Sequence, residues 1–338
     1  MNTLFKTYGF TQFINPVRCS RMPRSTSGLP RAVVASLTAF AGLLSVAPSV
    51  SAQPSASTPA LTASASDRTP ATGCRFVPER KDDFAWENDQ VAFRAYGPAL
   101  RSGPEDSGID CWLKRVHYRI IDSWYSGQAR GVSYHQDRGE GYDPYHVGSS
   151  RGCGGLALWA DDQLVLSDTY VAWRVIERSL ERSVFELDYL YPAVAGATPI
   201  AETKRISIRL GEPFCRVEAR FTRAGQPVAD LAVAIGVTTH DGKARATLRP
   251  ENRWIACWET LDKEGLGTGV VLDRGFPVVE TREVKNTTKD ASHALLLTRT
   301  NASGVVSYHT GFAWTKAGRI QSPEEWAARL DARAASND

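Results

Sequence analysis

Ionisable side chains gather in one glycine-rich stretch of the chain, residues 134–155, which reads YHQDRGEGYDPYHVGSSRGCGG. Six glycines follow Arg138 within this stretch. Glycine is typical of tight turns and of places where backbones approach closely, so the stretch is predicted to be a shaped loop. Ionisable groups concentrated on such a loop favour a binding or catalytic surface.

Three residues of this loop have types and spacings suited to proton transfer. His135 and Asp137 lie two positions apart, so at the end of a strand both side chains would point to the same face. Glu140 follows Gly139 on the turn and is expected to face back toward them. A carboxylate beside a histidine holds one tautomer, and a second carboxylate can serve as the opposite acid or base. The alternative is that these short polar side chains only cap turns.

A fourth acid–base candidate lies far along the chain. His309 stands beside Tyr308 and two residues before Gly311, near the end of a predicted strand. The three loop residues and His309 are therefore the catalytic candidates, with a structural histidine as the alternative for His309. Ring opening of a sugar, proton abstraction beside a uronate carboxyl, and glycosidic hydrolysis could all use this set.

Aromatic and basic side chains supply candidates for substrate binding. The chain holds nine tryptophans and eleven tyrosines, and flat aromatic faces can stack on the apolar faces of sugar rings. Arginine binds carboxylates in bidentate fashion. The candidates are Trp112, Lys114, Trp124, Tyr125, Tyr142, Asp143, Arg151 and Trp314. Ordinary packing is the alternative for each of the aromatic residues.

The same loop offers oxygen ligands for a metal ion. Asp137, Glu140 and Asp143 recur at spacings of three and would suit calcium, but the residue order of an EF-hand is absent. His135, His146 and Cys153 match no standard zinc spacing. We therefore expect no metal or other cofactor, with calcium kept as an alternative.

An apolar run follows Arg31 and ends before Gln53. The run is shorter than the roughly 18 residues that a membrane span needs, and Ala52, with Val50 two places upstream, fits a signal peptidase site. Residues 1–52 are therefore predicted to be a signal peptide cleaved near Ala52, which places the mature protein in the periplasm or outside the cell. A buried core helix or a stop-transfer anchor is the alternative.

Removal of this segment changes the charge balance. It carries five of the 40 basic residues and none of the 37 acidic ones, which leaves 35 bases against 37 acids. Nothing in that balance indicates nucleic acid or an anionic membrane as a partner, and no membrane span is expected in the mature form. Residues 53–73 are rich in Ser, Thr, Ala and Pro and are predicted to be a disordered linker, followed by one domain over residues 74–338.

Period-two alternation of apolar and polar residues recurs through this domain. The segments that alternate are 91–97, 114–122, 154–162, 164–179, 184–191, 204–211, 215–223, 231–240, 293–300 and 305–314. A helix is indicated near the C-terminus, where Ser322 is followed by a proline, two glutamates and a helical run. The expected class is mainly β, a large antiparallel β-sandwich with a short C-terminal helix.

Several long segments resemble the bacterial family of domains of unknown function numbered 4861 (DUF4861). They are FVPERKDDFAWENDQVAFRAYGPAL (76–100), GIDCWLKRV (108–116), residues 134–159, FELDY (185–189) and the closing YHTGFAWTKAGRIQSPEEWAARL. The resemblance covers the chain from about residue 75 onward. It implies an exported protein associated with plant or algal polysaccharide breakdown, and a layout similar to the galactose mutarotase-like supersandwich. It implies no particular mechanism.

From the residues and this resemblance we expect an exported carbohydrate-active enzyme. Its expected substrates are acidic, uronate-containing oligosaccharides, and its expected chemistry is acid–base catalysis by histidine and carboxylate in a hydrolase, lyase or epimerase. One alternative is a noncatalytic carbohydrate-binding module. Another is a structural envelope protein that is stabilised by calcium.

Overall fold

The computed structural model describes residues 68–192 and 198–336. The predicted signal peptide and most of the predicted linker lie outside the described residues. The packed chain begins within the last residues assigned to that linker, because the buried Thr72 hydroxyl donates to the Ser179 carbonyl over 2.8 Å and Gly73 opens the first strand.

The described chain is built mainly from strands, with two α-helices. The strands are β1 (Gly73–Val77), β2 (Asp83–Glu87), β3 (Ala92–Ala95), β4 (Ile109–Lys114), β5 (Gly141–Tyr142), β6 (Cys153–Ala160), β7 (Gln163–Val165), β8 (Ala172–Arg178), β9 (Arg182–Tyr191), β10 (Ile200–Arg209), β11 (Phe214–Arg223), β12 (Gln226–Pro227), β13 (Ala232–Thr238), β14 (Arg245–Arg249), β15 (Trp254–Leu261), β16 (Glu264–Leu272), β17 (Glu280–Val284), β18 (His293–Arg299) and β19 (Val305–Trp314). The α-helices are α1 (Ile121–Ala129) and α2 (Pro323–Ala335), and short 3-10 turns lie at Pro98–Leu100, His240–Gly242, Pro250–Asn252 and Thr315–Ala317.

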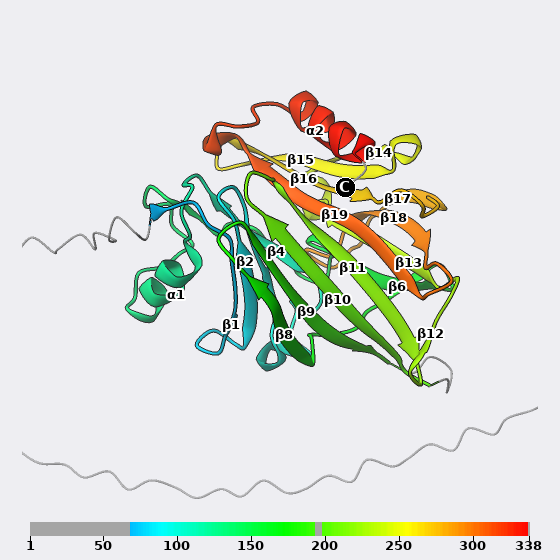
Figure 1. Cartoon of the computed structure of the whole chain (residues 1–338). Helices are drawn as coiled ribbons and strands as arrows, with labels where there is room; N and C mark the ends of the chain where they lie inside the picture. Colours follow the sequence, from blue (N-terminus) through cyan, green and yellow to red (C-terminus); the bar gives the residue numbers. More distant parts are fainter. Residues whose placement is uncertain (1–67, 193–197, 337–338) are drawn as a thin grey trace, which may run out of the picture. The chain divides into compact units, whose positions relative to one another are not determined.

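These strands form three antiparallel sheets. The largest has nine strands in the order β14-β15-β16-β19-β11-β10-β9-β8, with β12 paired to β11. Two sheets of five strands follow the orders β1-β2-β3-β4-β5 and β17-β18-β13-β6-β7. Figure 1 shows the large sheet with α2, in red, lying against its β15 and β16 end. The expected class, mainly β with a short C-terminal helix, is confirmed.

One face of the large sheet packs against both smaller sheets. Alternation along β10 buries Ile206 and Ile208 on this face, while Arg209 points to the other. On the neighbouring strand β9, the ring of Phe185 stacks on Phe84 of β2 with centroids 4.5 Å apart. Residues of all three sheets join one continuous apolar core. The result is the predicted sandwich, with one large sheet over two small ones.

Helix α2 covers part of the opposite, outer face of the large sheet. Trp326 and Leu330 of α2 pack over Gly267 and Gly269 of β16, where a Cβ atom would clash with them. The predicted start of this helix is confirmed, because the Ser322 hydroxyl accepts the Glu325 amide hydrogen over 3.1 Å. Beyond α2, the outer face carries polar and charged side chains from β9, β10, β11 and β19.

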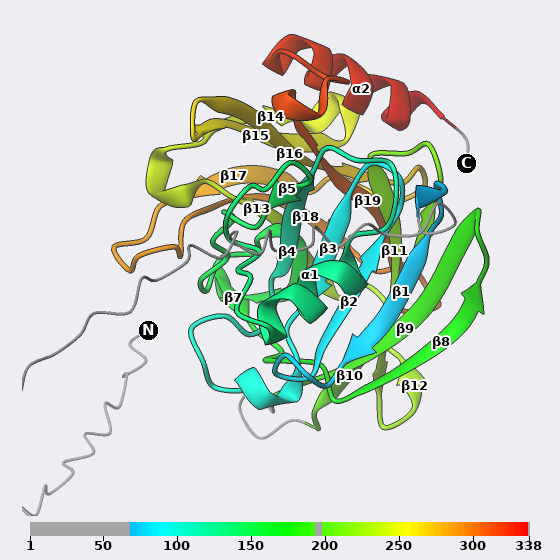
Figure 2. The same cartoon turned by 90° about the vertical axis from the view of Figure 1, so that its left-hand side faces the viewer.

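The predicted strand over residues 114–122 is wrong. Strand β4 ends at Lys114, and helix α1 begins at Ile121 and lies on the β1–β4 sheet (Figure 2). The carboxylate of Glu87 accepts hydrogen bonds from the backbone N–H groups of Ile120 and Ile121 over 2.9–3.0 Å. This carboxylate caps the first turn in place of a local side chain, so the helix start has no local sequence signal.

The five cysteines of the described chain are free and buried. None of the helices within residues 68–192 and 198–336 has the length and apolar character of a membrane span.

Candidate functional site

The loop over residues 134–155 does not join its three acid–base candidates into one set. The His135 ring is about half exposed, and its Nδ1 lies 2.8 Å from the backbone carbonyl of Asp143. Asp137 accepts from Lys316 Nζ over 2.8 Å and from the Gly139 amide over 2.9 Å. These contacts brace the loop, as the turn-capping alternative predicts.

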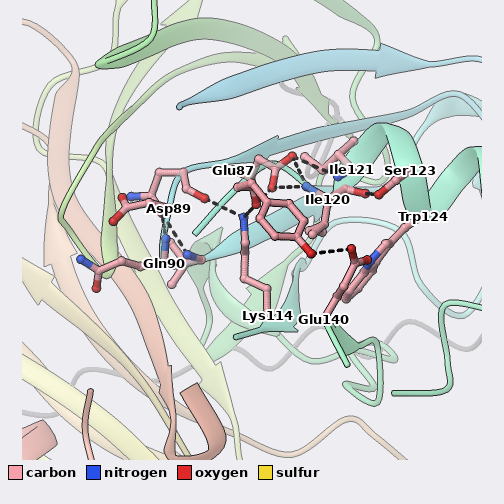
Figure 3. A network of polar contacts seen from close by, with 12 residues as sticks. Glu87, Asp89, Gln90, Lys114, Ile120, Ile121, Ser123, Trp124 and Glu140 are labelled. Atoms are coloured by element: carbon pink, nitrogen blue, oxygen red, sulfur yellow. Dashed lines mark hydrogen bonds and ion pairs between the residues drawn. The ribbon is translucent and has the colours of Figure 1, made fainter. Parts of the chain in front are cut away.

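Glu140 is equally committed to structural contacts. One carboxylate oxygen accepts from the Tyr118 hydroxyl over 2.8 Å and the other from Trp124 Nε1 over 2.9 Å (Figure 3). In the part of the chain that the structure describes, no hydrogen bond or ion pair links His135, Asp137 and Glu140 to one another. The expectation that Glu140 turns back toward the histidine is therefore corrected.

Lys114 is a buried structural residue, which corrects its assignment to substrate binding. Its Nζ donates to the Glu87 carboxylate and to the Asn88 carbonyl, each over 2.8 Å, and to the Tyr118 carbonyl over 2.7 Å. Figure 3 shows this ammonium group beside the carboxylate that also caps α1. All three ammonium hydrogens have acceptors, so none is left for a substrate carboxylate.

We expect Lys114→Met to destabilise the protein by about 3–5 kcal/mol, because it leaves the Glu87 carboxylate buried without its counter-ion. Unfolding in urea measures this change. The matched control is Lys289→Met, because Lys289 forms an ion pair with Asp290 at 3.5 Å and its side chain is 83% exposed. The control should cost about 1 kcal/mol or less. A loss below about 1 kcal/mol for Lys114→Met would show that the buried pair is not needed.

A second buried network surrounds Arg94. Its guanidinium lies 2.6 Å from Asp110, 3.5 Å from Asp143 and 3.8 Å from Asp83. Burial raises the pKa of Asp110 to about 8, with the charge of Asp143 adding to the shift and Arg94 opposing it. Burial likewise raises the pKa values of Asp83 and Asp143 to about 6, against the opposing charge of Arg94.

This network predicts a pH dependence of stability. A folded pKa above the unfolded value means that the native state holds the Asp110 proton more tightly, so the stabilisation is complete below about pH 4 and is lost as the pH rises through about 8. We expect the free energy of unfolding of the wild type, relative to Asp110→Asn, to fall between pH 4 and 8 by at most about 1.4 kcal/mol per pH unit. Urea unfolding at several pH values measures the difference. A difference in free energy of unfolding between wild type and Asp110→Asn that stays constant or rises with pH would contradict this prediction.

Other predicted substrate-binding residues are also buried. Trp112 is stacked between Trp124 and Tyr134, with centroids 5.4 and 4.8 Å away, and is 1% exposed. Five side chains predicted to bind sugar are buried by packing, so that prediction is corrected for them. They are Trp112, Trp124, Tyr125, Asp143 and Arg151.

Arg151 is the clearest of these corrections. It is fully buried, its guanidinium donates to the Ser107 hydroxyl over 3.1 Å, and burial lowers its pKa. Tyr142 is also buried, and its hydroxyl donates to Asp262 over 2.7 Å. The ring of Tyr142 contacts Trp314, with centroids 5.8 Å apart, and Trp314 lines a cavity described below.

The structure gives no support to a metal centre. The described residues contain no group of three His, Cys, Asp or Glu side chains placed to hold an ion. The acids proposed for calcium instead contact cations or side-chain donors: Asp137 binds Lys316, Glu140 binds Tyr118 and Asp143 lies beside Arg94.

Two adjoining cavities lie on the outer face of the large sheet beside α2. Their volumes are about 550 and 290 Å³, and His309, Arg216 and Arg333 line both. We call them together the arginine groove. Two acids and six arginines line it, and these residues are Glu212, Asp273, Arg182, Arg209, Arg216, Arg253, Arg274 and Arg333.

The register of the sheet positions the side chains of this groove. Arg216 of β11 pairs with His309 of β19 on one side and with Ser207 of β10 on the other. Arg209 of β10 pairs with Arg182 of β9. Because side chains alternate along a strand, these residues face away from the buried core. The groove is thus built on paired strands and not on the glycine-rich loop.

His309 is held by an acid within the groove. Its Nδ1 lies 2.9 Å from Asp273 Oδ1, and Asp273 Oδ2 accepts from Arg216 Nε over 3.0 Å and from the Ser307 hydroxyl over 2.7 Å. Burial opposes ionisation of Asp273, but the contacts with His309, Ser307 and Arg216 outweigh it and lower its pKa.

This geometry is suited to proton transfer. An ionised Asp273 that accepts the Nδ1 proton leaves Nε2 of His309 as the basic nitrogen. No residue of the described chain hydrogen bonds to Nε2. Nε2 is therefore available to a ligand in the groove. Of the four catalytic candidates, His309 is the one that a cavity and an orienting carboxylate support.

Comparisons with known proteins give the family. The model of a domain of unknown function, DUF4861, matches residues 49–337. The chain is 37% identical over 263 residues to "Uncharacterized protein P7" of Formosa agariphila, which covers 75% of this chain and 64% of that protein. The chain thus spans less than two thirds of the length of that relative.

Similar solved structures include a family GH92 inverting mannosidase from Bacteroides thetaiotaomicron (12% identity, TM-score 0.34, covering 55% of this chain and 24% of that one). They also include a heparinase III (9% identity, TM-score 0.37, covering 74% of this chain and 36% of that one). A third is a GH36 α-galactosidase from Geobacillus stearothermophilus (10% identity, TM-score 0.35, covering 71% of this chain and 41% of that one). These proteins are carbohydrate-active enzymes, but scores this low carry no argument about the present chain. On the match to the family model, the chain belongs to the DUF4861 family.

Proposed function

We propose that this protein acts on acidic oligosaccharides that bind in the arginine groove, with His309 as the acid–base group. The observation that carries the proposal is the His309 ring, fixed by Asp273 at the place where the two arginine-lined cavities join. The proposal moves the predicted chemistry from the glycine-rich loop to the outer face of the large sheet.

The charge of the groove supports an anionic ligand. Six arginines face two acids there, and Arg209 has no hydrogen bond or ion-pair partner for its guanidinium in the described chain. Arg182 contacts only the exposed Glu177, at 3.2 Å. Guanidinium groups bind carboxylates with paired hydrogen bonds, so Arg182 and Arg209, which pair across β9 and β10, suit the carboxylate of a uronate.

Size and wall chemistry agree with a saccharide. Ligand pockets of about 300–1,000 Å³ hold small organic molecules, and the larger cavity measures about 550 Å³. Hydroxyls of Ser207 and Ser307 line the groove beside the aromatic ring of Phe214. What the family resemblance implies supports the carbohydrate class, and the charge of the groove supports the proposed preference for acidic units.

The geometry favours proton abstraction beside a uronate carboxyl over hydrolysis by two carboxylates. Asp273 is tied to His309 and Arg216, so it is not free to serve as a second catalytic acid. An arginine bound to the uronate carboxylate would stabilise the charge that develops when Nε2 removes the adjacent C–H proton. In a lyase, the bond from the next ring carbon to the glycosidic oxygen then breaks, a C=C bond forms, and the leaving oxygen takes a proton from His309. In an epimerase, the carbon must instead take a proton on its opposite face, for which solvent is the donor. A lyase or an epimerase is the reaction class that this supports.

Incubation with a panel of uronate-containing and neutral oligosaccharides, followed by mass spectrometry, tests the proposal. We expect a uronate substrate to give either unsaturated products whose masses sum to that of the substrate, or a product of unchanged mass. Gain of one water would instead indicate hydrolysis. Binding without turnover would support the noncatalytic module, and preference for neutral sugars would contradict the proposed function.

Export also belongs to this proposal. It rests on the signal peptide predicted over residues 1–52. N-terminal sequencing of protein recovered from the periplasm tests cleavage near Ala52.

A further inference from the structure

A third cavity, of about 310 Å³, lies beside the arginine groove. Its walls include Gln90, Lys114, Trp314, Ala317 and Arg319. We call it the Trp314 pocket. It draws on the end of β19, the following 3-10 turn and the segment before β3, none of which lines the arginine groove.

The turn between β10 and β11 separates this pocket from the groove. Gly211 and Pro213 line the Trp314 pocket, whereas the intervening Glu212 lines the groove. Glu212 also forms an ion pair of 2.8 Å with Arg329, which lines the pocket. Both side chains are about 40% exposed, and exposed ion pairs contribute little stability. The two cavities are therefore divided by one short turn and one exposed ion pair.

The charges of the pocket also favour an acidic ligand. Three cations line it and no acid does, but Lys114 is neutralised by Glu87. Arg329 is similarly paired with Glu212. Arg319 differs, because its guanidinium donates a hydrogen bond of 3.3 Å to the backbone carbonyl of Asp89 and not to an acidic side chain. Arg319 is thus the cation of the pocket with charge left to bind an anion.

A polar group of Trp314 also lacks a protein partner. Trp314 is 3% exposed, and its indole Nε1 is buried with no hydrogen-bond acceptor in the described chain. Trp314 nevertheless lines the pocket, so its aromatic ring, and not the buried Nε1, is the part that a sugar ring can contact.

We infer that the Trp314 pocket is a second subsite for the same acidic oligosaccharide, with Arg319 binding the carboxylate of a uronate beyond the groove. The inference rests on the proposed function, because the groove must hold the rest of the chain. A sugar that spans both cavities passes over the β10–β11 turn. Longer uronate oligosaccharides should therefore bind more tightly than dimers.

Calorimetric titration with oligosaccharides of two and five units, prepared from polygalacturonate and from alginate, tests the inference. We expect the wild type to bind the pentamer of at least one series about tenfold or more tightly than its dimer. Ala317→Trp should fill the pocket and reduce pentamer affinity to that of the dimer, without changing dimer binding. Arg319→Ala should weaken pentamer binding about tenfold, the effect of one lost charge-assisted contact.

Controls separate this inference from the proposed function. Arg223→Ala removes an exposed arginine at the far end of β11 and should leave both affinities unchanged. Thermal unfolding of each variant checks that the fold is retained. Equal affinity of the wild type for dimer and pentamer, or a pentamer affinity insensitive to both substitutions, would overturn the second subsite alone. Failure of the wild type to bind any of the four probes would overturn the proposed function as well.

Discussion

Replacing His309 with asparagine should lower kcat on a uronate oligosaccharide by about 10²–10⁴-fold, the usual contribution of a general acid–base group. The substitution removes Nε2 as a base, while an amide of similar size can still contact Asp273. Substrate affinity should change little, because the arginines of the groove supply the ionic contacts. Steady-state kinetics on the substrate found in the oligosaccharide panel measures both quantities.

His135→Asn is the matched control for this prediction. His135 is the histidine that sequence spacing favours for catalysis, and its ring is about half exposed. We expect this variant to keep wild-type kcat and thermal stability. Loss of activity in His135→Asn with full activity in His309→Asn would return the active site to the loop over residues 134–155.

Asp273→Asn separates positioning from catalysis. Its carboxylate orients the imidazole and stabilises the imidazolium that forms when Nε2 takes a proton. The loss of that charge should lower kcat more than it changes KM, because the imidazole is no longer oriented and its protonated form is no longer stabilised. A purely structural role would lower stability without lowering kcat of the folded variant.

The double substitution Arg182→Ala and Arg209→Ala should weaken binding of a uronate oligosaccharide by about 100-fold or more. Each arginine offers charge-assisted hydrogen bonds. Because the two residues are paired across adjacent strands, both can bind the same carboxylate. Binding should also lose much of its dependence on salt. Titration calorimetry at low and high ionic strength measures both effects.

The fold should tolerate this double change. Arg209 has no ion pair in the described chain, and the pair of Arg182 with Glu177 is exposed on both sides. Arg223→Ala, on the same sheet but outside the groove, is the control and should bind as the wild type does. Unchanged affinity and unchanged salt dependence in the double variant would show that the anion binds elsewhere.

Sequence patterns predicted the framework of this site but not its assembly. Alternation of apolar and polar residue types identified the strands containing Arg209, Arg216 and His309. The same alternation placed Arg209 opposite Ile208, on the polar face. Which strands become neighbours depends on contacts between distant segments, so nothing local showed that Arg216 would lie beside His309.

Errors in the prediction have the same non-local origin. The start of α1 depends on the carboxylate of Glu87, which lies 33 residues before Ile120. Nothing in the sequence indicated the partners that hold the loop acids, because those partners are distant along the chain. Lys316, which contacts Asp137, lies 179 residues away. Arg151 lies in the loop sequence, yet folding buries it against Ser107.

Nuclear magnetic resonance of the histidine rings tests the central claim most directly. The chain contains six histidines, and the spectrum of His309→Asn assigns the resonance of His309. On titration with a uronate oligosaccharide, the ring nitrogens of His309 should shift while those of His135 stay in place. A shift at His135 with no change at His309 would contradict the assignment of the ligand to the arginine groove.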